Sequence, residues 1–524
     1  MKLSASIAAV LAYATVACYI YHKVRESISR AVKARRLGCK PAVRNSCRDP
    51  SGIYNLLLFQ RAHGKNRFLD FVQEQVYSLQ ESLGRPLKTL AVRTMFFQDL
   101  IFTFDPLIIQ TVLALKFQDF ELGVGRTENF KPVLGNGIFA ANGRQWEDGR
   151  NLIRPRLLRI RTDLGREDRH VQALMAALEG RRGEDGWTER LDLQELLFRY
   201  ALDSATDFVF GQSVDAQLAQ GAGTGFLEAM DRTLSGMTEG ARLGKHYWLA
   251  HTREFKRAVE VVDATAYRHI HAAIQQRMGE EQGLEGGLER GWEKREAFID
   301  ALIEDCQDPY ELRGQLLSIL MAGRDTTAST LAWFFHIMAD VRHRAVFRRL
   351  RAVIVDEFGG GSSPREMSVG RLRNCQYLQW CVNECLRLYP AVPLNTRVAR
   401  VDTHLPTGGG RDGTSPIFMK KGDEIVYSTH HLHRCKEIWG PDADVFRPER
   451  WQNKPAKWEY LPFHGGPRSC VGQQHALVRI THLIVRLVQR VEAIEGPGVE
   501  QAEHVLTLVN CPANGVCVRL RFAE

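Results

Sequence analysis

A ten-residue stretch near the C-terminus, Phe463-His464-Gly465-Gly466-Pro467-Arg468-Ser469-Cys470-Val471-Gly472, constrains this chain more strongly than any other. Apolar residues recur at helical spacing from Gln473 onward, so the stretch predicts a glycine-bounded loop that leads into a helix. Cys470 then lies just before a helix N-terminus. We expect the positive end of the helix dipole and the charge of Arg468 to lower the pKa of its thiol.

Five positions of this stretch fit one pattern at fixed spacing: Phe463, Gly466, Arg468, Cys470 and Gly472. A lone cysteine in such a loop is more often a small buried hydrophobe. A thiolate held in this way can, however, ligate haem iron, and glycines let the backbone approach a flat macrocycle. The pattern resembles the haem-binding loop of the cytochromes P-450. The resemblance implies heme b as the cofactor, with the Cys470 thiolate as axial metal ligand and the other four residues around the ring.

Two further segments contain candidate ligands of the haem propionates. Trp146 and Arg150 are one helical turn apart, and a surface cation–π pair is the simpler explanation of that spacing. In the same family, W-x-x-x-R on a helix binds a propionate, which implies that role here. Gly149 weakens this helix by about 0.5–1 kcal/mol. Arg397 follows Pro393 in a segment that the resemblance assigns to the haem edge, so it is a third candidate.

Residues 308–341 predict one long helix, because Asp308-Pro309 is a start signal and no later proline interrupts it. Its middle contains Ala322-Gly323-Arg324-Asp325-Thr326-Thr327. Small residues would let a ligand lie against the helix, and a hydroxyl beside a carboxylate can deliver protons. A solvent-exposed Asp-Thr pair is the alternative, although the flanking residues are apolar. The segment resembles the oxygen-activating helix of the P-450 enzymes, which implies catalytic roles for Asp325 and Thr326.

A structural role is expected for three other patterns. Glu384 and Arg387 alone would be a weak surface ion pair, but with Arg450 they resemble the structural Glu-Arg-Arg cluster of the same family. Three glycines at 408–410 predict a hairpin turn. A cluster of three histidines comprises His430, His431 and His433. No second group of ligands lies at zinc-site spacing from it, so we interpret these histidines as structural.

Charge and cysteine usage limit the partners and the compartment. The chain has 70 Lys and Arg against 61 Asp and Glu, a net charge of +9. No basic run is interleaved with aromatic residues, so nucleic acid is not an expected partner; a membrane surface or an acidic protein fits better. The 11 cysteines include no C-x-x-C pair, which argues against a disulfide framework and favours a reducing compartment.

The N-terminus predicts a membrane anchor. Residues 3–21 contain no charged side chain and can just span a bilayer as a helix. Basic residues follow this run, so the positive-inside rule predicts a single-pass protein of the endoplasmic reticulum membrane with its catalytic domain in the cytosol. A cleaved signal peptide is the alternative, but its basic residues should precede the apolar run.

The predicted fold is mainly α with small β-sheets (α+β), the cytochrome P-450 fold behind an N-terminal transmembrane helix. We expect an anchor at 1–22, an irregular basic connector at 23–65 and a haem-binding monooxygenase domain at 66–524. Within that domain the patterns predict helices at 66–83 and 193–209, a strand at 94–104 and a loop-rich segment at 117–139.

Residues 117–123, 202–211 and 405–410 further resemble the fungal microsomal alkane- and fatty-acid-hydroxylating P-450 family. This implies hydroxylation of long alkyl chains at or near the terminal carbon, using O2. The implied electron donor is NADPH–cytochrome P-450 reductase, with cytochrome b5 as an optional second donor. The alternatives are a monooxygenase of a larger secondary metabolite or sterol-like substrate, a haem-thiolate isomerase or dehydratase, and a non-catalytic haem protein.

Overall fold

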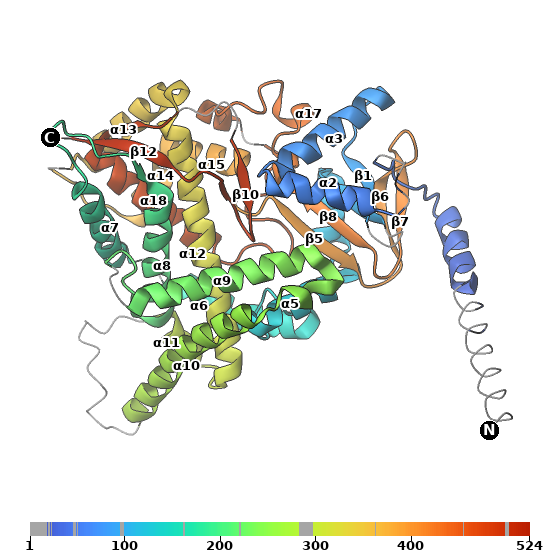
Figure 1. Ribbon diagram of the computed structural model, residues 1–524, viewed down its shortest axis with the longest axis horizontal. Coiled ribbons are helices and arrows are strands. Elements are labelled where there is room, and N and C mark those ends of the chain that lie inside the picture. Colours follow the sequence, from blue (N-terminus) through green and yellow to red (C-terminus); the bar gives the residue numbers. More distant parts are fainter. Residues whose placement is uncertain are drawn as a thin grey trace. The chain divides into compact units, whose positions relative to one another are not determined.

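The computed structural model describes residues 18, 21, 24–45, 49, 51–94, 99–160, 163–218, 222–281, 297–361, 363–453, 455–497 and 502–523. The chain divides into two compact units. The first comprises Met1–Leu57, Gln73–Glu121 and Thr396–Tyr427, and the second comprises Leu58–Val72, Leu122–Asn395 and Ser428–Glu524. Helices dominate and the sheets are small, which confirms the predicted fold class (Figure 1).

A five-stranded sheet forms the centre of the first unit. Its strand order is β1-β2-β8-β5-β3. The bounds are β1 (Thr89–Arg93), β2 (Asp99–Thr103), β3 (Phe120–Glu121), β5 (Leu394–Ala399) and β8 (Glu424–Ser428). β2 pairs antiparallel with β1 and parallel with β8, while β3 and β5 are antiparallel.

A separate hairpin of the first unit joins β6 (Thr403–Gly409) to β7 (Ser415–Met419). Gly408 and Gly409 end β6 and Gly410 begins the turn; Gly408, with φ of +96°, donates its N–H to the Gly413 carbonyl oxygen at 2.8 Å. The predicted hairpin is confirmed. Short helical turns follow β2: α4 (Pro106–Gln110), η2 (Thr111–Leu115) and η3 (Phe117–Asp119). The Asp105 carboxylate caps α4 by accepting from the N–H groups of Leu107 and Ile108.

Helices make up most of the second unit. Two earlier helices, α2 (Ile53–Gly64) and α3 (Phe68–Leu83), each belong partly to the first unit and partly to the second. The others before α12 are α5 (Val124–Leu134), α6 (Gly143–Arg159), α7 (Leu164–Glu179), α8 (Leu193–Phe210), α9 (Ala222–Leu243), η4 (Gly244–Ala250), α10 (Arg253–Glu281) and α11 (Phe298–Ile303). From α12 onward they are α12 (Pro309–Ala339), η5 (Val341–His343), α13 (Arg344–Phe358), α14 (Val369–Asn374), α15 (Gln376–Leu388), α16 (Thr429–Leu432), α17 (Lys436–Trp439), η6 (Pro448–Gln452) and α18 (Gln473–Arg490).

Two small sheets complete the second unit. One has the strand order β4-β12-β9, with β4 (Leu191–Asp192), β9 (Val491–Glu495) and β12 (Cys517–Phe522). The other is an antiparallel pair of β10 (His504–Leu506) and β11 (Asn510–Pro512). β11 packs against α12, so a short stretch of extended backbone covers part of the longest core helix.

The helix α12 is the core element of the second unit. Its start is the one predicted: Asp308 caps it by accepting from the Tyr310 N–H at 3.0 Å, and Pro309 is the first residue. Its 31 residues span about 46 Å. It packs along α8 and also against α15 and α18 (Figure 1). Apolar side chains such as Leu331, Trp333 and Phe334 are fully buried in the same cluster as α18 residues.

The helix predicted at 66–83 corresponds to α3, and the one predicted at 193–209 corresponds to α8, which ends at Gly211 with φ of +75°. The strand predicted at 94–104 is confirmed only as β2, because residues 95–98 lie outside the described residues. The loop-rich assignment of 117–139 is wrong, since α5 lies there. Its glycines serve close packing instead: a Cβ on Gly125 would lie 3.0 Å from the Gly244 carbonyl oxygen.

The predicted connector at 23–65 is not irregular throughout, because residues 24–36 and α2 are helical. Pro41 falls between these helices rather than within them, and Pro50 lies outside the described residues. The predicted anchor at 1–22 lies outside the described residues except for Cys18 and Tyr21. Among the described residues, no helix has both the length and the apolar character needed to cross a membrane.

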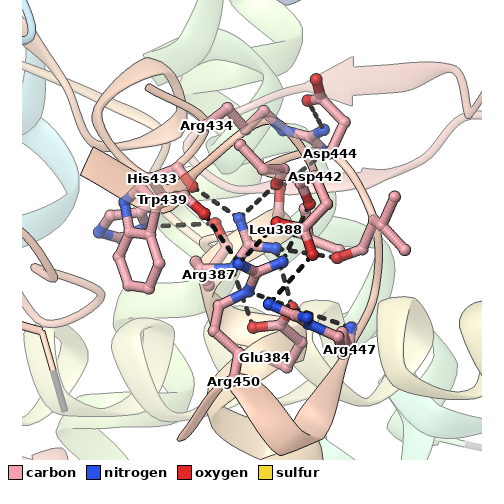
Figure 2. Close-up of polar contacts among 12 residues, drawn as sticks. Glu384, Arg387, Leu388, His433, Arg434, Trp439, Asp442, Asp444, Arg447 and Arg450 are labelled. Carbon is pink, nitrogen blue, oxygen red and sulfur yellow. Dashed lines mark hydrogen bonds and ion pairs between the residues drawn. The ribbon is translucent and has the colours of Figure 1, made fainter. Parts of the chain in front are cut away.

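The predicted Glu-Arg-Arg cluster is present and buried (Figure 2). Glu384 accepts from Arg387 at 2.9 and 2.8 Å and from Arg450 at 3.3 Å. It also accepts from the indole N–H of Trp451 at 3.0 Å. Arg387 in turn donates to the His433 carbonyl oxygen at 2.7 Å, so the cluster ties α15 to the loops that follow α16 and α17. Its role is structural, as predicted.

We expect Glu384→Gln to destabilise the protein by about 3–5 kcal/mol, because it leaves the buried Arg387 guanidinium without its carboxylate and leaves Arg450 with Asp442 alone. Urea unfolding of the variant and the parent measures this loss. The matched control is Glu449→Gln, which removes an ion pair with Arg349 whose side chains are 54% and 37% exposed. That change should cost less than about 1 kcal/mol. Equal losses would contradict a special role for the buried cluster.

Candidate active site

Backbone hydrogen bonds fix the loop that carries Cys470. The Cys470 N–H donates to the Phe463 carbonyl oxygen at 3.1 Å, and the Ser469 N–H donates to that of Gly466 at 3.0 Å. Gly466 has φ of +73°, a conformation in which a Cβ would be strained. Phe463 packs against the apolar core, and α18 begins at Gln473 as predicted. Cys470 therefore lies at the end of a well-defined turn, three residues before a helix.

The Cys470 thiol faces an enclosed space. The residue is exposed, yet enough protein surrounds it that burial raises the pKa of the thiol. A thiol that a water molecule can touch but that protein atoms largely surround has both properties: an exposed surface and a pKa raised by desolvation. The Gly472 N–H and the Arg150 charge lower the pKa, but burial is the larger effect. The expectation of an acidic free thiol is therefore wrong, because desolvation outweighs the helix end. A bound metal cation is what would stabilise the thiolate.

Trp146 is buried and has a guanidinium group near its ring on two sides. The guanidinium carbon of Arg468 is 4.3 Å from the ring centre, and that of Arg150 is 5.9 Å from it. Arg150 also donates to the Ser469 carbonyl oxygen at 3.0 Å, and Arg468 donates to that of Ala141 at 3.1 Å. The structure thus brings the predicted Trp146, Arg150 and Arg468 together beside the cysteine loop.

This cluster is suited to an anionic ligand. Burial and the neighbouring Arg154 lower the pKa of Arg150, which means that the positive charge is poorly compensated there. Within the described part of the chain, no carboxylate forms an ion pair with Arg150. Carboxylate groups of a bound molecule would supply the missing negative charge through charge-assisted hydrogen bonds. The haem propionates are such groups, so the residues present fit the implied cofactor.

Gly149 allows the helix that carries Trp146 and Arg150 to approach α12. A Cβ at this position would lie 2.6 Å from the side-chain nitrogen of Gln315. Gln315 is fully buried, and that nitrogen donates to Glu311 at 2.7 Å. The glycine that weakens α6 as an isolated helix is therefore a packing requirement in the folded protein.

Four accessible positions form a stripe on α12. From Leu312 to Phe335 every residue is buried except Ile319, Ala322, Gly323 and Thr326. Their spacing of three, one and three residues puts them on one face of the helix. The Thr326 hydroxyl donates to the Ala322 carbonyl oxygen at 2.7 Å. The accessible stripe is the part of this helix face that a ligand can reach, and it includes the predicted Thr326.

Asp325 lies beside this stripe and is almost fully buried. Burial raises the pKa of its carboxyl to about 6, with Arg324 lowering it and Asp231 raising it. A carboxyl with this pKa exchanges protons near neutral pH, as a general acid must. The solvent-exposed alternative for the Asp-Thr pair is therefore wrong, because Asp325 is buried and Thr326 is only partly accessible.

A buried ion pair that the sequence did not predict links α18 to α7. Arg479 on α18 lies 3.0 Å from the Glu167 carboxylate on α7, and both are buried. A Cβ on Gly323 would lie 3.8 Å from the Arg479 guanidinium. The hydroxyl groups of Tyr200 and Ser204 donate to the same carboxylate. Sequence could have singled out Arg479 only as a charge on the apolar face of α18.

Arg397, Gly472 and the three histidines are the remaining residues that the sequence singled out. Arg397 is buried on β5, in the first unit, and donates to the Thr396 carbonyl oxygen at 2.6 Å. Its role toward a propionate stays a prediction. Gly472 ends the cysteine loop, and no atom lies within 4 Å of where its Cβ would be. The histidines behave as structural residues: His431, for example, contacts the Leu69 carbonyl oxygen at 3.2 Å. No group of three metal-ligating side chains occurs among the described residues.

A model of the family described as Cytochrome P450 matches residues 51–513. The chain belongs to the cytochrome P450 family. It is 40% identical to the cytochrome P450 monooxygenase g430 of Fusarium sp, over 99% of this chain and 91% of the relative. It is 36% identical to the cytochrome P450 monooxygenase alt2 of Alternaria solani, over 98% and 99%. It is also 36% identical to cytochrome P450 52A13 of Debaryomyces hansenii, over 84% and 83%.

As a P450, the protein is a monooxygenase with the predicted fold. Cytochromes P450 use heme b held by a cysteine thiolate, a hydrophobic substrate, O2 and electrons from a redox partner. When bound, the haem iron supplies the oxygen-activating chemistry. The Trp146 cluster and the cysteine loop are the parts of this chain whose residues fit that cofactor.

We expect Asp325→Asn to stabilise the folded protein most above pH 7. The folded pKa of about 6 exceeds the ordinary 3.8, so the Asp325 contribution to stability falls as pH rises from about 4 to about 6. Asparagine removes this loss, which amounts to about 3 kcal/mol when complete. Unfolding in urea at pH 5 and at pH 7.5 measures it. The control is Asp185→Asn, whose side chain is 60% exposed; the same pH trend in both variants would contradict this account.

Proposed function

We propose that this P450 hydroxylates long alkyl chains of fatty acids or n-alkanes, at or near the terminal carbon. The observation that supports this best is the accessible stripe of α12, whose side chains are an isoleucine, an alanine and a threonine beside a glycine. No charged side chain of α12 is accessible between Leu312 and Phe335. An alkyl chain gains about 25 cal/mol for each Å² that it removes from water at such a surface.

Two further observations support the alkyl class. Residues 117–123, 202–211 and 405–410 resemble segments of the fungal alkane- and fatty-acid-hydroxylating family. A relative from Debaryomyces hansenii that is 36% identical carries the name cytochrome P450 52A13. The relative with 40% identity, however, is named only as a monooxygenase. A larger secondary metabolite or a sterol-like molecule is therefore the alternative that an experiment must separate.

In this proposal Cys470 ligates the haem iron, and Trp146, Arg150 and Arg468 bind its propionates. Their common position beside the cysteine loop supports these roles. Arg397 is proposed as a further propionate ligand. Phe463, Gly466 and Gly472 shape the loop around the cofactor.

We assign proton delivery to Asp325 and Thr326. Asp325 can take up and release a proton close to neutral pH because burial raises its pKa to about 6. The Thr326 hydroxyl lies on the accessible stripe one residue further along and already donates to the Ala322 carbonyl oxygen. Together they offer a buried acid and a hydroxyl on the accessible stripe, which is what controlled protonation of bound oxygen needs.

The electron donor in this proposal is NADPH–cytochrome P-450 reductase, with cytochrome b5 as an optional second donor. The proposed location is the endoplasmic reticulum membrane, with one transmembrane segment at 1–22 and the haem-binding domain of 66–524 in the cytosol. The uncharged run at 3–21 and the basic residues behind it support this assignment.

We expect Thr326→Ala to keep the haem and bind substrate but to release hydrogen peroxide in place of product. Loss of the hydroxyl should lower product formed per NADPH about tenfold or more. The measurement compares NADPH consumed, product and peroxide in one reaction. The matched control is Thr330→Ala, since the buried Thr330 hydroxyl donates to the Thr326 carbonyl oxygen one turn away from the stripe. Full coupling in Thr326→Ala would contradict the proton-delivery role.

The proposed substrate class is tested by titrating the purified ferric protein with hexadecanoic acid, with hexadecane and with a sterol. We expect a low-spin to high-spin shift with the linear ligands, because an alkyl chain that reaches the iron displaces water from it. The tighter of the two decides between acid and alkane. A shift with the sterol alone would overturn the alkyl proposal in favour of a larger substrate. Turnover without any need for reductase would indicate an isomerase or dehydratase.

A further inference from the structure

A buried arginine on α12 is shared between two carboxylates. Arg324 Nη2 is 2.5 Å from the Asp231 carboxylate on α9, and its Nη1 is 3.2 Å from the carboxylate of Asp325. The side chains of Asp231, Arg324 and Asp325 are 57%, 2% and 8% exposed. The three charges therefore run from solvent at α9 into the core of the second unit.

The two contacts of Arg324 differ in kind. The contact with Asp231 is a hydrogen bond. The contact with Asp325 is close enough to be an ion pair, but Nε and Nη1 of Arg324 and Oδ1 of Asp325 have no hydrogen-bond partner among the described residues. Buried polar groups without partners are costly, and a charge-assisted hydrogen bond between these two would satisfy both. Arg324 thus has a formed hydrogen bond to Asp231 and two unused N–H donor nitrogens, one of them beside Asp325.

We propose that Asp231 is a positioning residue for the reaction: by binding Arg324, it keeps Asp325 out of a full ion pair and able to carry a proton. This inference rests on the proposed proton-delivery role of Asp325. It gives α9 a role in the reaction, because the position of α9 determines whether Asp231 can bind Arg324. A displacement of α9 would let Arg324 turn to Asp325 and hold it as a carboxylate.

The groups that face Asp325 agree with this arrangement. Arg324 comes from its own helix, Asp231 from α9 and Cys511 from β11. Arg479 approaches the neighbouring Gly323 from α18. Asp231 raises the pKa of Asp325 and Arg324 lowers it. Removing the Asp231 charge should lower the pKa of Asp325 in two ways. It ends the repulsion between the two carboxylates, and it frees Arg324 to bind Asp325.

The same helix provides a matched control. Arg313 on α12 is buried and donates through Nε to the Asp263 carboxylate on α10 at 2.7 Å. It precedes Arg324 by 11 residues, which is about three turns and puts both arginines on one face, about 16 Å apart along the axis. Asp263→Asn therefore breaks an equivalent link from α12 to a covering helix without reaching Asp325.

The first measurement is infrared spectroscopy of the ferric holoenzyme without substrate, titrated with pH. The carbonyl band that disappears in Asp325→Asn reports the protonated Asp325 carboxyl. We expect its midpoint to fall by about one pH unit in Asp231→Asn, because Asp325 gains an opposite charge at short range. It should stay in place in Asp263→Asn and return toward the parent value in Asp231→Glu. Asp231→Ser serves the same test if Asp231→Asn does not fold.

The second measurement is the pH dependence of product formed per NADPH. In Asp231→Asn, coupling should fall several-fold at pH 7.5 and recover toward lower pH, whereas Asp263→Asn should follow the parent. If the band and the coupling respond alike in Asp231→Asn and Asp263→Asn, or in neither, this inference is overturned. If Asp325→Asn itself couples fully, the proposed role of Asp325 fails, and this inference fails with it.

Discussion

The burial of α12 on nearly every side is the constraint on which the rest of the second unit depends. A helix of about 46 Å that is accessible at only four positions between Leu312 and Phe335 must be covered by α8, α15, α18 and β11 at once. These neighbours are held by interactions that are themselves buried, such as the Glu384 cluster and the Glu167–Arg479 pair. The arrangement of α12 and its neighbours is therefore fixed by contacts within the protein itself.

Buried charge is the second theme of this fold. Four arginines of the second unit, Arg313, Arg324, Arg387 and Arg479, are almost completely removed from water, and each has a carboxylate partner. Desolvation makes such pairs poor contributors to net stability, while the loss of one partner is expensive. They are better understood as fixing which elements face one another. Arg313 and Arg324 illustrate this, because Arg313 connects α12 to α10 and Arg324 connects it to α9.

Local patterns in the sequence predicted the parts of the site that depend on neighbouring residues. The cysteine loop, the start of α12 at Asp308-Pro309 and the pairing of Trp146 with Arg150 all follow from short-range spacing. The partners of Arg324 and Arg479 could not be predicted, because they are distant in sequence: Asp231 precedes Arg324 by 93 residues. The predicted low pKa of Cys470 was wrong for a related reason. Burial raises this pKa, and burial depends on the whole fold rather than on neighbouring residues. α5 was missed because its glycines look like loop residues until their packing is known.

Gly149 shows how a defect in one element can set the geometry of another. As an isolated sequence, α6 would gain from any side chain at this position, and alanine is the usual stabilising replacement. In the folded protein the absent side chain is the reason that α6 lies directly on Gln315 of α12. The spacing between these two helices is therefore set by a backbone rather than by adaptable side chains. Trp146 and Arg150 are thereby held close to α12, and any side chain at position 149 would push them away from it.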